Sequence, residues 1–309
     1  MDNLVAGGAG FLGSHTISRL LKDGEKVICL DNFSTGKITN INSWVKHPNL
    51  KIIDHDILYP IDLRVDRIWH FACPASPKIY QKDPIKTAKI NFIGTLNLLE
   101  IARNSNSQFL LASTSEIYGD SKEITQSECN NGILKTSSIR SCYREGKRIA
   151  ETICFDYSRI YNINIHVARI FNTYGPNMSK NDGRVISNFI NQALNNKNIT
   201  IYGTGYQSRS FCYVDDLIDG LVRFVNCSNI GPINFGNPYE KISIKDLAKM
   251  IRLKTNLSLP FIYSPIPHDD PCMRQPNIEK AKSLLHWDPK IDLDKGLNKT
   301  INYFKKINV

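Results

Sequence analysis

Asn3-Leu4-Val5-Ala6 is followed by Gly7-Gly8-Ala9-Gly10-Phe11-Leu12-Gly13, so that a short apolar strand runs into glycines spaced G-x-x-G-x-x-G. Glycines let a backbone turn tightly and approach a pyrophosphate, and the helix that follows supplies N-terminal amides with partial positive charge. A second apolar strand, residues 26–30, ends in Asp31, where dinucleotide-binding folds hydrogen-bond the adenosine ribose. These features predict a dinucleotide site. The acid favours NAD over NADP because it would repel a 2′-phosphate.

Strand and helix patterns alternate along the first half of the chain. Strand-like segments follow at residues 51–54, 67–71, 108–113 and 164–171, and helical patterns lie at residues 85–104 and 143–161. Such alternation is typical of a parallel sheet covered by helices on both faces. We therefore predict an α/β fold with a Rossmann-type doubly wound parallel sheet. Asp56 and Ile57, after the third strand, are candidate adenine contacts, although a plain surface aspartate fits position 56 nearly as well.

The pattern loosens in the second half of the chain. Helices are predicted at about 184–195 and 293–304 and a short strand at 200–202, and no internal repeat or linker separates the halves. We predict a Rossmann NAD-binding domain over residues 1–172, with residues 210–235 returning to it. A smaller mixed α/β C-terminal domain is expected over residues 173–309, sharing a cleft with the first.

Composition argues against several classes of protein. Of the 309 residues, 41% are hydrophobic and 22% are charged, as in ordinary globular proteins. No apolar run reaches the roughly 18 residues of a membrane span and no signal segment precedes Asn3, so we expect a cytoplasmic protein without a membrane partner. Eight scattered cysteines and seven histidines show no zinc-like spacing, so no metal is predicted. The net charge of +10 is spread along the chain, which argues against a nucleic-acid partner and would favour anionic substrates by steering.

Tyr143 and Lys147 stand four residues apart in a helical pattern, which puts them on one face of the helix. An ammonium beside a phenol favours the phenolate, which would bring the tyrosine from an ordinary pKa of about 10 towards that of a general base. Two residues on a solvated helix face would show the same spacing. The glycine turn upstream and the polar strand end between the two motifs favour the catalytic interpretation.

Polar residues end the strand at 108–113, where the sequence continues as Ser113-Thr114-Ser115-Glu116. Open α/β sheets bind ligands at the carboxyl ends of their strands. Thr114 can hydrogen-bond a substrate hydroxyl and Glu116 adds a carboxylate. Serine and threonine also serve simply to cap strand ends, but the neighbouring motifs favour function.

Three arginines of the second half, Arg184, Arg209 and Arg274, each stand beside turn residues. Planar guanidinium groups suit phosphate and carboxylate. A single arginine is more often a surface residue, so anion binding and a solvated surface position fit each of them about equally.

Together these motifs resemble the extended short-chain dehydrogenase/reductase family and, within it, the UDP-glucuronate decarboxylases (UDP-xylose synthases). The resemblance runs from Leu4 to about Phe304. The glycine turn and the Tyr143/Lys147 pair are shared broadly in that family. Segments more specific to the decarboxylases are Ala72-Cys73-Pro74-Ala75-Ser76-Pro77, Ser113-Thr114-Ser115-Glu116-Ile117-Tyr118-Gly119, Arg140-Ser141-Cys142-Tyr143, Arg169-Ile170-Phe171-Asn172-Thr173-Tyr174-Gly175-Pro176 and Asp182-Gly183-Arg184-Val185.

The resemblance implies a reaction on a UDP-sugar. Tyr143, supported by Lys147, would take the proton of the sugar C4 hydroxyl, oriented by Thr114, while hydride passes to NAD. The C5 carboxylate would then stand β to a ketone, so that CO2 can leave, and protonation at C5 with return of hydride gives UDP-xylose. Near the reacting end of the sugar the resemblance places Glu116, Ser115 and Arg274. Around the diphosphate, the uridine or the far side of the cofactor it places Asn172, Arg184 and Arg209.

The resemblance also implies a cofactor site and a homodimer. The residues expected to contact NAD are Gly7, Gly10, Phe11, Leu12, Gly13, Asp31, Asn32, Asp56, Ile57, Ala72, Tyr143 and Lys147. The domain over 173–309 would bind the nucleotide sugar. The two long helices, at 85–104 and 143–161, would pair across a dimer axis as a four-helix bundle.

The residues after Thr114 help to choose among relatives. The 4,6-dehydratases place Asp-Glu there and epimerases usually have no carboxylate, whereas this chain has Ser115-Glu116, which suits decarboxylation. A UDP-hexose 4-epimerase or a nucleotide-sugar 4,6-dehydratase on the same scaffold is the alternative. A catalytically silent NAD-binding scaffold is a different class, and intact Tyr143, Lys147 and Thr114 argue against it. The chain departs from the resemblance at Arg144, where aspartate is usual, and in the segment 135–139.

Overall fold

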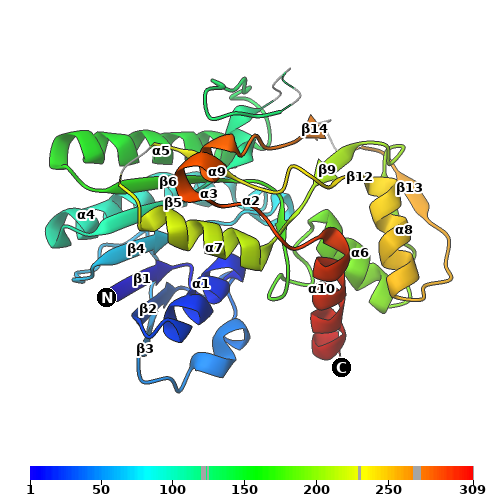
Figure 1. Cartoon of the computed structure of the whole chain (residues 1–309), viewed down its shortest axis with the longest axis horizontal. Coiled ribbons are helices and arrows are strands. Elements are labelled where there is room, and N and C mark those ends of the chain that lie inside the picture. Colours follow the sequence, from blue (N-terminus) through cyan, green and yellow to red (C-terminus); the bar gives the residue numbers. More distant parts are fainter. Residues whose placement is uncertain (120–122, 124, 229–230, 267–272, 309) are drawn as a thin grey trace.

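A seven-stranded parallel sheet forms the core of the larger part of the molecule (Figure 1). The computed structural model describes residues 1–119, 123, 125–228, 231–266 and 273–308. The strands, in the spatial order β11-β6-β5-β4-β1-β2-β3, are β1 (Asp2–Ala6), β2 (Lys26–Asp31), β3 (Leu50–Asp54), β4 (Arg67–His70), β5 (Gln108–Thr114), β6 (Ile165–Ile170) and β11 (Ile233–Phe235). The predicted Rossmann-type sheet is confirmed.

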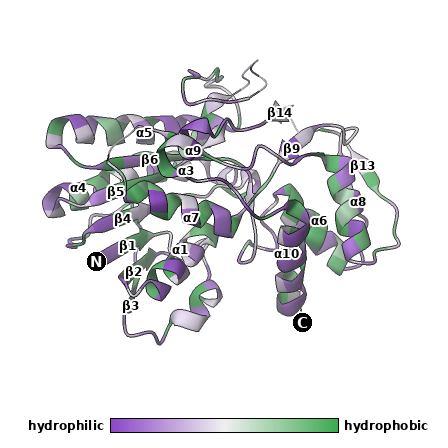
Figure 2. Ribbon diagram, in the orientation of Figure 1, coloured by the Kyte–Doolittle hydropathy of each residue, from purple (hydrophilic) through white to green (hydrophobic). Residues whose placement is uncertain are grey.

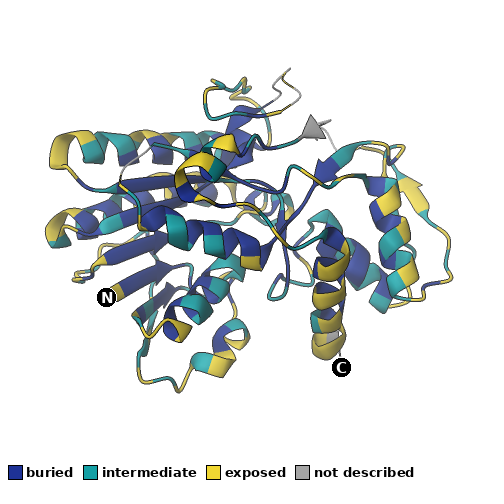
Figure 3. Ribbon diagram, viewed as in Figure 1, coloured by how far each residue is buried: buried dark blue, intermediate teal, exposed yellow. Residues whose placement is uncertain are grey.

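Helices cover both faces of this sheet (Figure 1). One face carries α1 (Phe11–Lys22) and α7 (Val214–Val225), and the other carries α4 (Thr95–Ser105) and α5 (Ser141–Tyr161). Successive strand residues point to opposite faces. In β1, Val5 therefore packs in one hydrophobic cluster with α1 and α7, while Leu4 and Ala6 pack in the other with α4 and α5. The central strands are accordingly buried, and exposed residues lie on the outer turns of the helices (Figure 3).

The helix predicted at 85–104 is interrupted. It consists of α3 (Pro84–Lys89), a π-helical turn, η2 (Ile90–Gly94), and α4. At the interruption the Asn91 side-chain amide donates to the Thr87 carbonyl at 3.0 Å, and the Thr95 hydroxyl donates to the Asn91 carbonyl at 2.6 Å. Side chains that bond helical carbonyls in this way distort the regular ladder.

The second half of the chain builds a smaller lobe beside the sheet, at the right of Figure 1. Its helices are α6 (Val185–Leu194), α8 (Ile244–Lys254) and α10 (Leu293–Asn308). Three small sheets join β10 (Cys212–Tyr213) to β7 (Thr173–Tyr174), β13 (Ile262–Ser264) to β8 (Thr200–Tyr202), and β12 (Lys241–Ser243) through β9 (Ser208–Ser210) to β14 (Met273–Arg274). Helix α9 (Glu279–Leu285) instead packs against β11 and α7.

Shorter helical turns complete the first half: η1 (Ile38–Trp44), α2 (Pro77–Tyr80) and η3 (Ser115–Tyr118). Hydrophobic and hydrophilic segments alternate along the helices that flank the sheet (Figure 2), as expected for helices with one buried side. Within the described part of the chain, no helix combines the length and the apolar content that crossing a bilayer requires.

Candidate active site

A cavity of about 1100 Å³ lies between the carboxyl ends of the sheet strands and the smaller lobe. It gathers side chains that are far apart in the sequence. Among its lining residues are the predicted positions Gly7, Gly10, Phe11, Leu12, Gly13, Asp31, Asn32, Asp56, Ile57, Ala72, Thr114, Ser115, Glu116, Tyr143, Lys147, Asn172, Arg184 and Arg209. Arg274 is the exception: its backbone pairs with Arg209 in the β14–β9 ladder, and its side chain lies outside the described part of the structure.

The glycine turn stands at one end of the cavity. Gly7 has a φ of +77°, which glycine adopts without strain, and a Cβ at Gly13 would collide with the Gly7 carbonyl. Asp31 braces the turn from β2, because its carboxylate accepts hydrogen bonds from Ala9 N–H at 2.9 Å and from Phe33 N–H at 2.8 Å. Burial raises the pKa of Asp31, and these two hydrogen bonds oppose the rise.

Asn32 and Asp56 are hydrogen-bonded to each other beside the glycine turn. The Asn32 amide donates to Asp56 at 2.9 Å, Leu58 N–H donates at 3.1 Å and the Lys86 ammonium lies at 3.5 Å. Burial acts to raise the pKa of Asp56, but these partners outweigh it and hold the pKa below its ordinary value. The aspartate considered for a plain surface position is thus part of the cavity wall.

Tyr143 is buried at the start of α5, with its ring stacked on that of Tyr80. The two ring centroids are 5.0 Å apart and the planes differ by 4°. Burial, followed by the nearby Cys73 and Glu116, raises the pKa of Tyr143, while a hydrogen bond with Thr114 lowers it. The net direction is opposite to that expected from the Tyr-x-x-x-Lys spacing. Spacing along a helix reports neither the depth of the phenol nor the cost of ionising it there.

Lys147, one turn further along α5, is also buried, and burial lowers its pKa. Among the groups that oppose this shift is Glu151, which lies a further turn along the helix. Arg169 of β6 holds Glu151, with Nη2 at 2.8 Å from Oε2 and Nε at 3.2 Å from Oε1, and the Ser113 hydroxyl donates to the same carboxylate. A buried ion pair thus supports the helix turn that carries Lys147.

Glu116 lies two residues after Thr114, in η3, and faces the first turn of α5. Its carboxylate accepts a hydrogen bond from Arg144 Nε at 3.1 Å, and Arg140 Nη1 lies 4.0 Å away. Its backbone N–H donates to the Thr114 hydroxyl at 3.2 Å. The contact joins the strand end that carries Thr114 to the helix that carries Tyr143.

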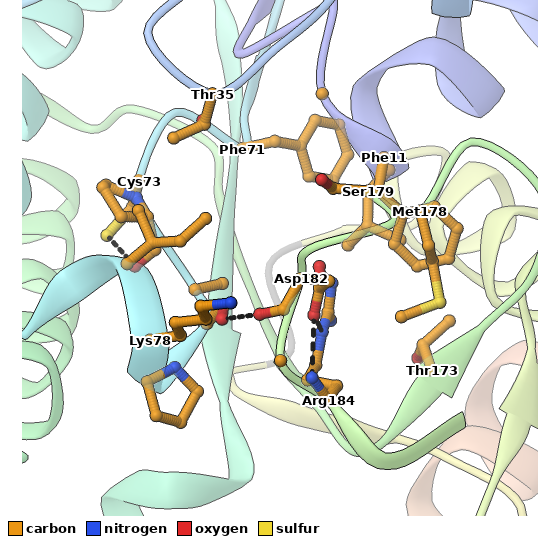
Figure 4. A pocket seen from close by; sticks show the side chains of 18 of the residues that line it. Phe11, Thr35, Phe71, Cys73, Lys78, Thr173, Met178, Ser179, Asp182 and Arg184 are labelled. Carbon is orange, nitrogen blue, oxygen red and sulfur yellow. Dashed lines mark hydrogen bonds and ion pairs between the residues drawn. The ribbon is translucent and has the colours of Figure 1, made fainter. Parts of the chain in front are cut away.

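Arg184 also lines the cavity, beside Asp182 (Figure 4). It forms a two-pronged ion pair with Asp182, at 2.5 and 2.7 Å, and its guanidinium sits 5.7 Å from the centre of the Phe11 ring. The Ser76 hydroxyl donates to the Asp182 carbonyl, so two loops from different halves of the chain meet here.

Arg209 and Asn172 line the cavity from the second half of the chain. Arg209 Nη1 donates to the Ser208 carbonyl at 2.9 Å, and the Asn172 amide lies 3.5 Å from the Ser210 carbonyl. Both side chains are therefore fixed by the strand β9, which also pairs with β12 and β14.

Sequence reasoning did not single out several residues of this site. The sequence assigned no role to Tyr80, Arg140, Glu151 and Arg169, and Arg144 stood out only as a departure from the resemblance. The signal for part of this was present, since residues 140, 144, 147 and 151 recur at helical spacing. Among the described residues, no cluster of three or more His, Cys, Asp and Glu is arranged to hold a metal ion.

Comparison with known proteins gives consistent matches. A family model described as the NAD dependent epimerase/dehydratase family matches residues 3–235. UDP-glucuronic acid decarboxylase 1 of Xenopus tropicalis is 48% identical over 303 residues, covering 98% of this chain and 72% of that protein. The structure of UDP-glucuronic acid 4-epimerase from Bacillus cereus, in complex with UDP-glucuronic acid and NAD, is 31% identical with a TM-score of 0.90 and covers 99% of this chain and 100% of that one. UDP-glucose 4-epimerase of Thermotoga maritima with UDP-glucose is 28% identical, with a TM-score of 0.91 and complete coverage of both chains.

Proposed function

The chain belongs to the NAD dependent epimerase/dehydratase family, and we propose that it is an NAD-dependent decarboxylase converting UDP-glucuronate to UDP-xylose. The observation that carries this proposal is its 48% identity, over 98% of its length, with a UDP-glucuronic acid decarboxylase. The Ser115-Glu116 pair after Thr114 supports decarboxylation over dehydration, because a single carboxylate is not the acid and base pair that dehydration needs.

The cavity fits NAD as the cofactor. The glycine turn and the N-terminus of α1 form a surface where backbone can approach a pyrophosphate closely, and the first turn of α1 carries no acid to repel it. Asp31 and the Asn32–Asp56 pair stand beside this turn and offer acceptors for ribose and adenine groups. When bound, NAD supplies an acceptor for the hydride of sugar C4 and gives it back at the end of the reaction.

The chain's own residues would handle the protons and hold the sugar. Tyr143, in contact with Thr114, takes the proton of the C4 hydroxyl as C4 becomes a ketone. The bond from C5 to its carboxylate then breaks, its electrons move towards the C4 carbonyl as an enolate, and CO2 leaves. Protonation at C5 restores the ketone, and Tyr143 returns its proton to the C4 oxygen as that carbon is reduced.

Other residues would bind the substrate, and all of them except Arg274 line the cavity. We assign Ser115, Glu116 and Arg274 to the reacting end of the sugar, and Asn172, Arg184 and Arg209 to the diphosphate and uridine. Guanidinium groups pair well with phosphate oxygens. Arg184 is already oriented by Asp182 and Phe11, so less side-chain freedom would be lost on binding.

The deciding experiment supplies purified protein with UDP-glucuronate and NAD and measures released CO2 and the nucleotide-sugar products. We expect CO2 and a UDP-pentose in equal amounts. Isomerised UDP-uronate without CO2 would indicate a 4-epimerase, and turnover of UDP-glucose to a 4-keto-6-deoxy sugar would indicate a dehydratase. Bound NAD with no turnover of any of these sugars would indicate a silent scaffold.

Replacement of the proposed base provides the matched test. Tyr143→Phe should lower kcat by about 10²- to 10⁴-fold, the usual contribution of a general acid–base group, without loss of NAD binding. Tyr157→Phe, on the same helix but outside the cavity lining, should leave kcat unchanged. Unaltered turnover in Tyr143→Phe would remove this residue from the mechanism.

We further propose that the protein is a homodimer formed through α5 and the neighbouring turn η2. These elements present partly exposed apolar side chains next to one another, and a shallow hollow between them is lined by Phe92, Ile93, Cys142 and Ile149. A second copy of the same helices would cover this face, as an isologous dimer requires. The α4 and α5 helices pack together below it.

The domain boundaries and the cellular location of the protein are also proposals. We divide the chain into an NAD-binding domain over 1–172, joined by 210–235, and a nucleotide-sugar-binding domain over 173–309. Strand β11 supports the return, because it pairs with β6. A cytoplasmic location fits cysteines that are unpaired throughout the described residues.

A further inference from the structure

Arg144 occupies a buried position in the first turn of α5, directly against Glu116. Its Nε lies 3.1 Å from Glu116 Oε2, and the two side chains are only 4% and 11% exposed. Arg140, one helical turn earlier, approaches the other carboxylate oxygen at 4.0 Å. The usual aspartate of the resembling decarboxylases at position 144 would bring a negative charge to the place where this chain has a positive one.

The position of this contact in the fold makes it relevant to the reacting groups. Glu116 lies two residues after Thr114, and Arg144 lies one residue after Tyr143. The Arg144–Glu116 hydrogen bond therefore links α5, which carries Tyr143, to η3, which directly follows Thr114 at the end of β5.

Among the described residues, the charged and titratable groups near Glu116 include one on α2, three on α5 and one just before α5. They are Tyr80, then Cys142, Tyr143 and Arg144, and Arg140. A carboxylate removed from water is costly unless a partner of opposite charge meets it. A charge-assisted hydrogen bond to a guanidinium supplies that partner and favours the ionised form.

We propose that Arg144 is a positioning residue that holds Glu116 as a carboxylate in one orientation, so that Glu116 acts as a hydrogen-bond acceptor and not as a proton donor. The consequence for the reaction rests on the proposed function: the proton that C5 gains after CO2 leaves does not come from Glu116.

The proposed effect of Arg144 on Glu116 can be tested without any substrate. The chain contains nine glutamates, few enough for carbon-13 NMR of side-chain carboxyl groups in the full-length protein with NAD added. Glu116→Gln identifies the resonance by its disappearance. In the native chain we expect that resonance to stay at the position of an ionised carboxylate to the lowest pH at which the protein is folded. In Arg144→Gln its midpoint should move upward by about 1 to 3 pH units, the usual effect of one adjacent opposite charge.

Two further variants make the result decisive. Arg144→Lys keeps the charge and should retain most of the native titration, even if Arg144→Gln proves too unstable to measure. Arg159→Gln removes the same charge from the exposed end of the same helix and should leave the Glu116 resonance unchanged. A Glu116 resonance that titrates identically in the native chain and in Arg144→Gln, or that is already protonated at neutral pH, would overturn the proposal.

The pH profile of turnover gives a second readout. In Arg144→Gln the acid limb of kcat should move to higher pH, because activity is lost as Glu116 takes up a proton. In a Glu116→Gln background the same substitution should produce no further movement of that limb. Absence of decarboxylation in the native protein would refute the proposed function. The NMR titration would still show whether Arg144 holds Glu116 in the ionised form.

Discussion

Tyr80 buries a hydroxyl group beside the proposed base. Its side chain is fully buried, and among the described residues its hydroxyl oxygen has no hydrogen-bond partner. Burial raises the pKa of Tyr80, so the group stays a neutral phenol. Its ring, stacked on Tyr143, provides the packing, while the hydroxyl adds a desolvated polar atom.

Two replacements should separate the packing of the Tyr80 ring from the cost of its buried hydroxyl. Tyr80→Phe removes only the unpartnered hydroxyl, so the free energy of unfolding should stay the same or rise by up to about 1 kcal/mol. Tyr80→Ala removes the ring and should cost about 3 to 5 kcal/mol through the cavity it leaves. Urea denaturation of both variants measures this. A Tyr80→Phe variant that is clearly less stable than the native chain would show that the hydroxyl is satisfied in the folded protein.

For single residues, the sequence predicts which side chains line the site better than it predicts the surroundings that set their pKa values. Tyr143 and Lys147 were predicted from their helical spacing and Thr114 from its place at a strand end, and all three line the cavity. The direction of the Tyr143 pKa was not predictable. It depends first on burial and then on Cys73 and Glu116, which reach the phenol from other parts of the chain.

The contact between α5 and β6 is a buried ion pair. Arg169 and Glu151 have side chains only 12% and 9% exposed, and Arg169 also donates to the Tyr118 hydroxyl at 3.1 Å. Arg169→Met would leave the Glu151 carboxylate buried without its charged partner. We expect a loss of about 3 to 5 kcal/mol in the free energy of unfolding, measured by denaturant titration.

The double variant Arg169→Met/Glu151→Met separates a buried charge from lost packing. It should be more stable than Arg169→Met alone, because two apolar side chains of similar volume replace both charges. Arg159→Met, which breaks the exposed pair with Asp156 on the same helix, should change stability little. Equal losses in the single and double variants would mean that the pair acts through shape and not charge.

The sequence predicted that residues 85–104 are helical, but it did not predict that the helix is interrupted. The hydrophobic pattern over 85–104 indicated one helix, since a π turn adds only one residue to the period. At the interruption, η2, the side chains of Asn91 and Thr95 bond the helix backbone. Asparagine and threonine make such bonds in some helices and point to solvent in others, so sequence alone does not decide between these outcomes.

The proposed dimer is the prediction that belongs to the whole molecule. Ile149 lies 39% exposed on the α5 face beside Phe92 and Ile93. Ile149→Asp would bury an unpaired charge at the interface, so the protein should elute as a monomer in size-exclusion chromatography with light scattering. Ile160→Asp is the matched control, since Ile160 is 71% exposed near the end of the same helix and outside that hollow. A native chain that is monomeric, or an Ile149→Asp variant that stays dimeric, would contradict the proposed interface.

At the scale of the molecule, the parallel sheet followed from the alternation of strands and helices, whereas the small sheets of the second half did not. Strands of two or three residues, such as β7, β10 and β14, carry too few positions for a period to be visible. Their pairing depends on partners far along the chain, as in the β9 ladder.

Strand β11 gives this topology a consequence for biosynthesis. It forms the edge of the sheet next to β6, yet residues 171–232, which include α7 and part of the smaller lobe, separate the two in the chain. A ribosome has to release the polypeptide beyond Phe235 before that edge can close. Until then the backbone groups of β6 lack their partner strand, and an open strand edge is a template for wrong pairing. The nascent chain therefore passes through a stage at which holding chaperones would protect it most.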